Sequence, residues 1–330
     1  RSYSVTGVQT CALPICDGKL ERLVVVYLEA GFFFADENVK RRDFATAFRQ
    51  VEKSLPDALA AATGERGRRF RQGQGTLASR GTEFRHGDLS LRLLCEDDQL
   101  VSLTIQPATA ADRDYGADDL GSRQQRRRES GTRVEKLANG DVLIQGIPMS
   151  DQQNRSYCAM ATLAMILQYH GLNLDVDTLA AKAGYREGNP PNANALDFYR
   201  SAAKLANLRV RDTRAFSLRD VKKAIDRGEP VIFWRQFNRD RDEFHSQFAA
   251  RLEQEPQAEL PNPKGKEGRA DRRLWPDGKD GPGHASIITG YNEERGEIIF
   301  TESWGETYRN RRMRAEEAEA TTLLLFFFSL

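Results

Sequence analysis

The sequence predicts an α+β fold in which helices come first and a mainly antiparallel sheet follows. The segment 158–168 has Ala, Met, Leu and Ile on nearly every side, which is typical of a buried helix. Two apolar segments further on, 284–291 and 297–302, flank a polar turn as the strands of a hairpin do. Strand and helix patterns within 17–107 predict a second, smaller α+β domain that precedes this one.

Length and composition limit the possible classes of protein. The chain has 330 residues, which is enough for about two domains. Its 49 Lys and Arg residues balance 48 Asp and Glu residues, so the charge indicates neither a nucleic-acid nor an anionic-membrane partner. The mean hydropathy is −0.61, and no apolar run approaches the roughly 20 residues that a membrane span needs.

The N-terminal segment needs separate treatment. The chain begins with Arg1, and residues 5–15 read VTGVQTCALPI, which resembles a translated sequencing-library adapter. We therefore expect residues 1–16 to be an artefact and leave them out of fold reasoning. The two cysteines outside this segment, Cys95 and Cys158, predict neither a disulfide framework nor a cysteine-rich zinc site. The natural start is then missing, so the sequence assigns no compartment.

The small domain, 17–107, shows structural patterns but no chemistry. The Val-rich segment 20–28 is bounded by glycines, as a strand is. In 43–55, apolar residues recur every three or four positions, which predicts a helix that Pro56 ends or kinks. Further strands are expected at 68–77, 89–94 and 100–105. We expect Cys95 to be a packed or strand-edge residue.

A linker is expected between the two domains. Residues 108–132 are highly charged and carry almost no large apolar side chains, so they cannot bury a core. The arginine run at 126–128 is interpreted as a solvated part of this linker. The second domain is expected to span 133–330 and to begin with a hairpin, because the Asn-Gly pair at 139–140 favours the positive φ angles of a tight turn.

The elements of the second domain follow from capping residues, glycines and apolar periodicity. Helices are expected at 158–168, 175–183, 194–205 and 217–227, and strands at 208–213, 230–234, 284–291, 297–302 and 321–328. A long excursion, 235–283, interrupts the strands and contains one amphipathic helix and a loop rich in Pro, Gly and Lys. Loops of this length are often lids or disordered segments.

Cys158 stands where the predicted core helix begins, and this position suits a nucleophile. The N–H groups and dipole of a helix N-terminus favour the thiolate, which is the form that attacks a carbonyl. A histidine, His284, and then an acid, Glu302, follow downstream, and this chain order is typical of thiol catalysis. Without these partners, Cys158 would be interpreted as a small residue packed in the helix.

Gln152 is the candidate for stabilising an oxyanion. It lies six residues before Cys158 and can donate a side-chain N–H group, with the backbone N–H of Cys158 as the second donor. The neighbouring Gln153 is a competitor for this role. A polar loop residue without a role in catalysis is the alternative interpretation.

Glu302 can be placed from the geometry of the predicted hairpin. If the turn centres near Glu294, Glu302 lies opposite Ser286 and diagonal to His284, within reach of the imidazole. It can then hold the ring in one tautomer. Asn292, at the opposite end of the hairpin, is a weaker candidate.

The other histidines do not predict a metal site. His86 falls at an expected hairpin, His170 at a helix C-terminus and His245 in the excursion, and no two histidines have the spacing of metal ligands. The sequence therefore predicts neither a bound metal nor a cofactor.

These residues resemble those of papain-like cysteine peptidases, and most closely those of cysteine peptidase family thirty-nine, whose members remove double-glycine leader peptides from bacteriocins. In that clan a Gln stands six residues before the Cys, and Gln152, Cys158 and His284 match in order. The segment GHASIITGYN resembles the strand that carries the family's His. ESWG at 302–305 resembles the NSWG motif of papain relatives, in which the Asn orients the His and the Trp shields that contact.

The resemblance covers about 134–330 and implies a bacterial thiol protease that hydrolyses peptides or proteins without a cofactor. It assigns the triad to Cys158, His284 and Glu302, the oxyanion hole to Gln152 and a supporting role to Trp304. Glu302 stands where Asn or Asp is usual. Leader-peptide processing is not carried over, because the chain has no GxxxxGK[ST] loop of a fused ATPase.

Two alternatives remain open at this point. A transglutaminase-like acyltransferase uses the same order of Cys, His and acid. A non-catalytic binding module on a degenerate papain-like fold would also account for the unusual Glu302. The sequence gives no oligomeric state.

Overall fold

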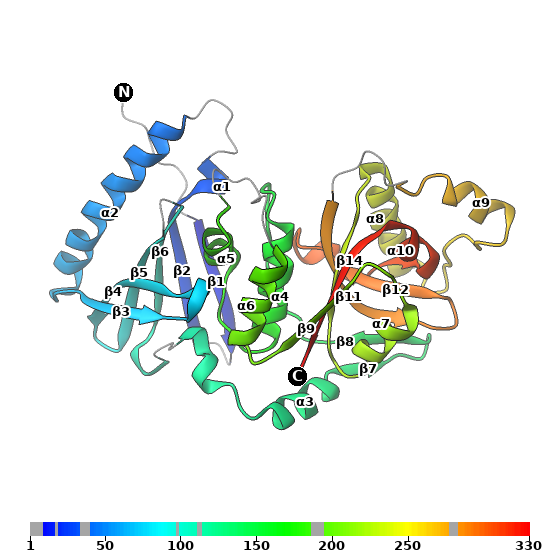
Figure 1. Cartoon of the computed structure of the whole chain (residues 1–330), viewed down its shortest axis with the longest axis horizontal. Helices are drawn as coiled ribbons and strands as arrows, with labels where there is room; N and C mark the ends of the chain where they lie inside the picture. Colours follow the sequence, from blue (N-terminus) through cyan, green and yellow to red (C-terminus); the bar gives the residue numbers. More distant parts are fainter. Residues whose placement is uncertain are drawn as a thin grey trace. The chain divides into compact units, whose positions relative to one another are not determined.

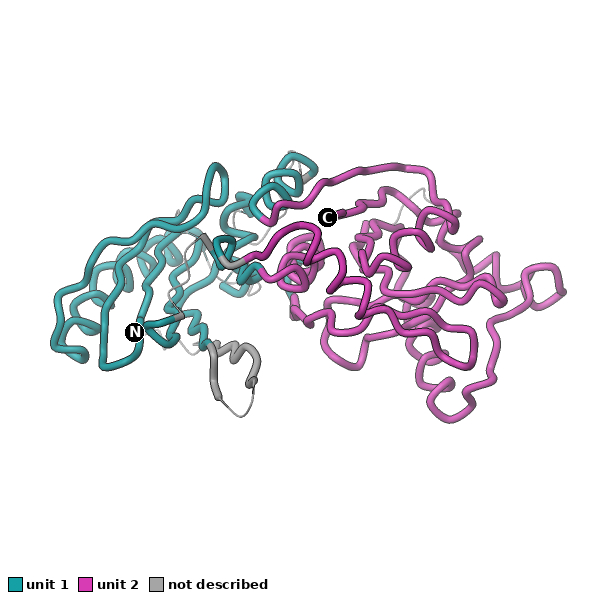
Figure 2. Tube along the Cα trace, turned by 90° about the horizontal axis from the view of Figure 1, so that it is seen from below, with its two compact units in different colours: residues 1–119, 154–157, 172–205 teal, residues 120–153, 158–171, 206–330 magenta. Residues whose placement is uncertain are grey.

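The computed structural model describes residues 9–16, 19–33, 40–96, 99–110, 114–185, 195–276 and 283–330. The chain forms two compact units, which Figure 2 colours separately. Unit 1 comprises 1–119, 154–157 and 172–205, and unit 2 comprises 120–153, 158–171 and 206–330. Unit 1 therefore includes two segments from within the second domain that the sequence predicts, 133–330.

Unit 1 is built on an antiparallel sheet whose six described strands have the order β1-β2-β6-β5-β4-β3 (Figure 1). The strands are β1 (Gln9–Cys16), β2 (Lys19–Glu29), β3 (Arg68–Gln72), β4 (Ser79–His86), β5 (Leu89–Glu96) and β6 (Leu100–Pro107). Strand β1 lies in the segment that resembles an adapter, and it pairs with β2.

Two helices cover opposite faces of this sheet. The long helix α2 (Arg41–Thr63) packs its apolar stripe, which includes Phe44 and Phe48, against one face. Helix α5 (Val176–Lys182) lies against β5 and β6, where Ala181 belongs to a separate apolar cluster. Shorter helices of this unit are α1 (Ala30–Phe33), η1 (Gly75–Leu77), η2 (Ala108–Ala110), η3 (Asp114–Asp119) and α6 (Ala195–Leu205).

Two local predictions for unit 1 differ from the structure. Helix α2 does not end at Pro56 but continues to Thr63, and the carbonyl that the proline leaves without a helical partner belongs to Glu52, which is exposed to water. The strand predicted over 68–77 ends early, since Gly73 and Gly75 have positive φ angles of 72° and 57° and turn the chain into a 3₁₀ helix.

A buried charge cluster holds the segment 154–157 within unit 1. The Tyr157 hydroxyl donates to Glu29 Oε1 at 2.5 Å, and the Arg155 guanidinium pairs with Glu29 at 3.3 Å and with Asp177. All four side chains are buried. Removing Arg155 would leave the buried carboxyl groups of Glu29 and Asp177 without their positive partner, so this residue fixes the segment within unit 1.

Unit 2 is built on an antiparallel sheet of eight described strands. Its main path is β13-β12-β11-β10-β14-β9, while β8 pairs with β11 and β7 with β8. The strands are β7 (Val134–Lys136), β8 (Asp141–Ile144), β9 (Arg209–Thr213), β10 (Val231–Gln236), β11 (Gly283–Asn292), β12 (Glu297–Thr301), β13 (Arg311–Arg314) and β14 (Thr322–Ser329). The predicted α+β class is confirmed.

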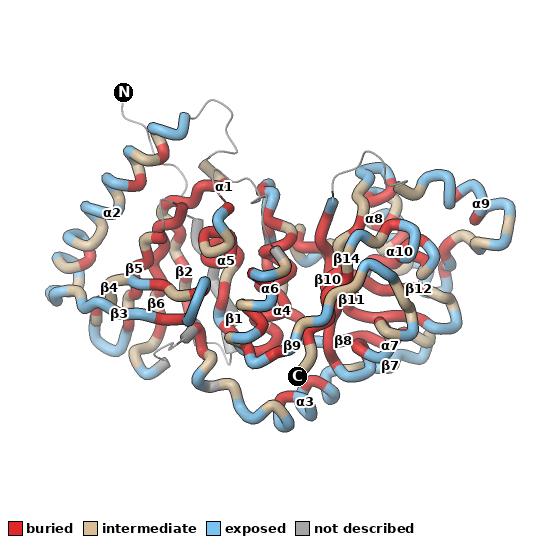
Figure 3. The backbone as a smooth tube through the Cα atoms, in the orientation of Figure 1, coloured by how far each residue is buried: buried red, intermediate tan, exposed pale blue. Residues whose placement is uncertain are grey.

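The apolar helix predicted before this sheet is α4 (Cys158–Tyr169), which contacts β11. It is buried on nearly every side, and β10 and β11 are likewise drawn as buried in Figure 3. Other helices of unit 2 are α3 (Arg123–Thr132), α7 (Leu218–Ile225), α8 (Arg239–Gln254), α9 (Lys266–Arg272), α10 (Ala315–Thr321) and η5 (Glu306–Tyr308). Among the residues described in either unit, no helix is long and apolar enough to cross a bilayer.

The predicted linker 108–132 contains a helix, and its arginine run is not uniformly solvated. Ser122 caps α3, and Arg126 is buried, donating to the carbonyl oxygens of Ala206 at 2.8 Å and His170 at 3.2 Å. A helix C-terminus leaves carbonyl groups without helical hydrogen-bond donors, and Arg126 donates to one of these carbonyls at the end of α4. Hydrogen bonds from a buried guanidinium thus hold this segment in place, although it has few apolar side chains.

The excursion 235–283 is largely helical where it is described. Its first residues complete β10, and the predicted amphipathic helix is α8, whose Phe244, Phe248 and Leu252 pack with Ala258 and Leu260. Residues 277–282 lie outside the described residues.

Gly290 allows β11 to approach β8 closely, and this generates a prediction. A Cβ atom there would lie 2.5 Å from the Val142 carbonyl oxygen. We expect Gly290→Ala to lower the free energy of unfolding by about 1–3 kcal/mol, because the backbone must shift to admit the methyl group. Urea unfolding measures this. Gly131→Ala in α3 is the control, since its Cβ meets nothing within 4 Å. Equal stability of the two variants would contradict the pairing.

Candidate active site

The β11–β12 hairpin carries the candidate imidazole and acid. Ile287 pairs with Thr301, so the next position places Ser286 opposite Glu302. This is the register that the turn position predicts. His284 and Ser286 share a face of β11, because side chains alternate along a strand, and Glu302 is thereby placed diagonal to the imidazole.

His284 and Glu302 are in direct contact. Nε2 of His284 lies 2.6 Å from Oε2 of Glu302. Trp304 stacks on the imidazole with 4.6 Å between ring centroids and 29° between planes, and Phe237 packs against both rings. These aromatic rings limit the access of water to the contact, and a hydrogen bond is electrostatically stronger in such surroundings.

Cys158 lies at the N-terminus of α4 and is half-buried. Burial by itself would raise the pKa of this thiol, but the hydrogen bond and the charge of His284 lower the pKa below its ordinary value. Backbone N–H groups of Ala285 and Ala159 favour the thiolate in the same way. Because Nε2 of His284 contacts Glu302, we assign the hydrogen bond with the Cys158 thiol to Nδ1.

The pKa of the His284 imidazole is shifted upward, opposite to that of the thiol. Burial by itself would lower the pKa of His284, but the charge of Glu302 and the hydrogen bond with Cys158 raise the pKa to about 9. A lowered thiol pKa beside a raised imidazole pKa favours a thiolate–imidazolium pair over a thiol beside a neutral imidazole.

Glu302 is completely buried and remains ionised because positive groups surround it. Burial would raise its pKa, whereas the charges of His284 and Arg235 hold the pKa well below the usual range of a glutamic acid. Sequence reasoning did not single out Arg235 or Arg311, the two arginines paired with this carboxylate. Arg235 directly follows the apolar run VIFW, and neither arginine carries a sequence signal of burial.

Gln152 is buried and oriented by Ser303, whereas its competitor Gln153 is exposed. The backbone N–H of Gln152 donates to the Ser303 carbonyl at 2.8 Å, and the Ser303 hydroxyl donates to Gln152 Oε1 at 2.7 Å. With Oε1 engaged, Nε2 is the donor end of the side chain. Ser303 follows Glu302 directly, so one short segment fixes both the acid and the amide.

The other candidate residues lie elsewhere. Asn292 binds Asp141 Oδ1 at 2.8 Å and the Asn139 carbonyl at 3.0 Å, so it is not a partner of the imidazole. His245 is buried against Glu317 at 3.0 Å. Cys95 lies in β5, and burial raises the pKa of its thiol to about 11. Within the ranges that the structure describes, no three His, Cys, Asp or Glu side chains are grouped as metal ligands.

Comparison with known proteins identifies a family to which part of this chain is similar. The model of a family described as the Peptidase_C39 like family matches residues 144–322. No curated protein matches the chain significantly.

Solved structures show a distant likeness. A protein described as a C39-like peptidase from Bacillus anthracis is 16% identical, with a TM-score of 0.36 over 57% of this chain and 96% of that one. The peptidase domain of Streptococcus ComA, an ABC transporter involved in quorum sensing, is 16% identical, with a TM-score of 0.34 over 56% and 98%. Xylellain, a cysteine protease from Xylella fastidiosa, is 13% identical, with a TM-score of 0.33 over 61% and 88%.

The opposed pKa shifts of Cys158 and His284 predict an unusual pH dependence of alkylation. We expect the rate of iodoacetamide reaction at Cys158 to stay nearly constant between about pH 6 and 8, because the thiol is already ionised. An ordinary thiol, with a pKa of about 8.5, would gain close to tenfold per pH unit there. The rate at each cysteine is measured by quantitative peptide mapping.

Cys95 serves as an internal control in the same sample, since a thiol with its pKa raised to about 11 should scarcely react below pH 8. The variant His284→Ala should restore the ordinary dependence at Cys158. A tenfold rise per pH unit at Cys158 in the unaltered protein would rule out the ion pair.

Proposed function

The chain belongs to the Peptidase_C39 like family, whose model spans residues 144–322, and on that premise we propose that it hydrolyses peptide bonds with Cys158 as its nucleophile. One observation carries the proposal. His284 interacts with the Cys158 thiol on one side and with the buried Glu302 carboxylate on the other. This arrangement activates a nucleophile and orients its base, which are the two requirements of covalent thiol catalysis.

The first half-reaction forms an acyl-enzyme. The thiolate attacks the peptide carbonyl carbon, a C–S bond forms, and the carbonyl electron pair moves to oxygen. Gln152 Nε2 and the backbone N–H of Cys158 stabilise this oxyanion. The His284 imidazolium then gives its proton to the amide nitrogen, the C–N bond breaks, and the amine leaves.

The second half-reaction releases the acid. Neutral His284 accepts a proton from water, the oxygen attacks the thioester carbon, and the C–S bond breaks to restore the thiolate. Throughout both steps Glu302 holds Nε2 at 2.6 Å, so that Nδ1 faces the sulfur. Trp304 shields this contact from water and fixes the ring plane.

Peptide cleavage is tested with a mixed peptide library of defined sequence, analysed by mass spectrometry. We expect new amino and carboxyl termini in the unaltered protein and none with Cys158→Ala, because only the sulfur differs. The same reaction is repeated with an added primary amine.

Two results would overturn the proposal. Amide products formed with the amine in the absence of hydrolysis would indicate an acyltransferase. Peptides that bind equally to the unaltered protein and to Cys158→Ala, without any covalent change, would indicate a binding module.

Removing the proposed oxyanion donor should reduce turnover selectively. We expect Gln152→Ala to lower kcat by about 10²–10³ with little change in KM, because the amide contacts charge that develops only in the transition state. Steady-state kinetics on one cleaved peptide measure both constants. Gln153→Asn is the matched control, since Gln153 is exposed and Asn tolerates its positive φ of 55°. An equal loss of kcat in both variants would show that Gln152 does not stabilise the oxyanion.

A further inference from the structure

We propose that Arg235 is a positioning residue that fixes the Glu302 carboxylate against His284, and that Asp242 of helix α8 holds Arg235 in place. Helix α8 (Arg239–Gln254), in the described part of the excursion, thereby supplies part of the framework of the site. This inference rests on the proposed function, because it concerns the partner of the same imidazole.

The two oxygens of Glu302 have separate partners. Oε2 contacts His284 Nε2 at 2.6 Å, while Oε1 accepts from Arg235 Nη2 and from the Ser286 hydroxyl, each at 2.8 Å. Arg311 Nη1 lies 3.6 Å from Oε1. A carboxylate bound on both oxygens cannot rotate away from the imidazole without breaking three contacts, and the fixed geometry therefore depends on the groups bound to Oε1 as well as on His284.

Arg235 is itself held from α8. Oδ1 of Asp242 accepts from Arg235 Nη2 at 3.0 Å and from Arg311 Nη1 at 2.9 Å, and the Asp242 carbonyl accepts from Arg311 Nη2. Both guanidinium groups lie over the Phe300 ring, at 5.5 and 5.4 Å from its centroid. One carboxylate of the excursion thus orients both arginines behind Glu302.

The charges of this cluster balance. Two carboxylates, Glu302 and Asp242, face two guanidiniums, and the thiolate faces the imidazolium. Both carboxylates and both arginines are buried, and a buried charge is tolerated only when it is paired. Loss of Arg235 would remove a contact that holds Oε1, so that the Glu302 carboxylate can turn away from the imidazole and no longer stabilises its charged form.

Further titratable groups near this cluster are His245 and Arg241 of α8 and Tyr308 of η5, whose ring lies against the Arg311 guanidinium. His245 is buried on α8 with its ring edge-on to Phe300 at 5.4 Å, and burial lowers its pKa, so it adds no positive charge at neutral pH. Arg241 points toward other partners. The positive groups that face Glu302 are therefore His284 from β11, Arg235 from β10 and Arg311 from β13.

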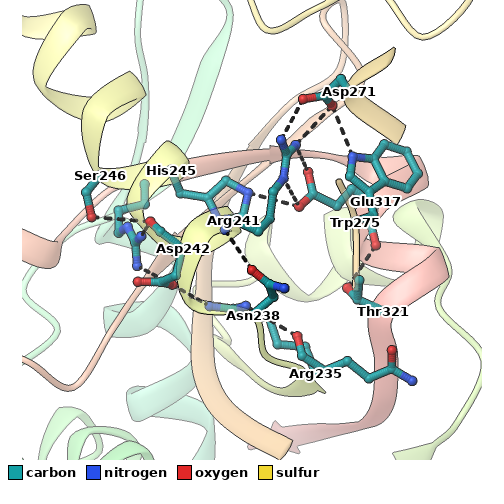
Figure 4. Close-up of polar contacts among 12 residues, drawn as sticks. Arg235, Asn238, Arg241, Asp242, His245, Ser246, Asp271, Trp275, Glu317 and Thr321 are labelled. Atoms are coloured by element: carbon teal, nitrogen blue, oxygen red, sulfur yellow. Dashed lines mark hydrogen bonds and ion pairs between the residues drawn. The ribbon is translucent and has the colours of Figure 1, made fainter. Parts of the chain in front are cut away.

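A second buried network anchors α8 to the rest of unit 2. Arg241 donates to Glu317 of α10 at 2.7 Å and to both oxygens of Asp271 of α9, and Trp275 donates to Asp271 at 3.0 Å (Figure 4). Opening α8 as a lid would expose these charges and withdraw Asp242 from both arginines. The geometry therefore describes a fixed support.

The test uses the pH profile of Cys158 alkylation, which needs no peptide substrate. In the unaltered protein the rate should be flat between an acid limb, where the thiolate gains a proton, and an alkaline limb, where His284 loses one. Arg235→Gln should raise the acid limb, because a positive charge near the thiolate is lost, and should lower the alkaline limb by about 1–3 pH units, because a carboxylate that turns away from the ring no longer stabilises the imidazolium. Arg235→Lys, which keeps the charge, should recover most of the flat range.

Two further variants distinguish a loss of carboxylate positioning from a general loss of stability. Ser286→Ala removes one hydrogen bond to Glu302 at little structural cost, and it should shift both limbs in the same directions by a smaller amount. Arg241→Gln is the matched control, because it removes an equally buried arginine, on α8, whose carboxylate partners do not include Glu302. It should lower stability and leave both limbs in place.

Asp242→Asn distinguishes a support from a lid. With one negative charge fewer, the cluster should disfavour the imidazolium, so the alkaline limb falls while KM for a cleaved peptide is unchanged. A lid would change KM and leave the limbs unmoved.

The alkylation profiles distinguish a failure of the proposed function from a failure of this inference. Absence of a flat range in the unaltered protein would overturn the proposed function. A flat range that neither Arg235→Gln nor Ser286→Ala narrows would overturn only this inference.

Discussion

A buried carboxylate that must remain ionised is the constraint on which unit 2 depends. Glu302 has no exposed surface, yet its charge stabilises the imidazolium of His284. An isolated carboxylate would be neutral in such a place, because burial disfavours the charged form by several kcal/mol. Strands β10 and β13 each bring an arginine to it, and helix α8 brings the acid that orients both. The residues packed around the site therefore keep the Glu302 carboxylate deprotonated.

Local patterns in the sequence carry much of the fold. The apolar surround of α4, the glycines and caps at helix ends and the polar turn after β11 each depend on neighbouring residues, so they can be recognised without knowledge of the tertiary structure. The same holds for the order of Cys158, His284 and Glu302 and for the register that places Ser286 opposite Glu302. Periodicity in a strand fixes which side chains share a face, and this made the hairpin geometry predictable.

Other features depend on partners far along the chain and carry no local signal. Arg126, Arg235 and Arg311 look like solvated residues in sequence, but each is buried because groups from distant segments pair with it. Helix α3 was not predicted, because its burial rests on hydrogen bonds to carbonyl groups and not on apolar side chains. Strand β14 was predicted as buried, yet its place between β10 and β9 follows from long-range pairing that composition does not encode.

The division of the chain into units has a consequence for how this protein can be cut or recombined. Segments 154–157 and 172–205 belong to unit 1, so the polypeptide crosses between the units several times before residue 206. No single break in the backbone separates one unit from the other. A fragment that starts near residue 133 would carry α5 without the strands it rests on and Arg155 without Glu29. Gene fusion or domain exchange at that point would therefore yield an incomplete core in unit 1.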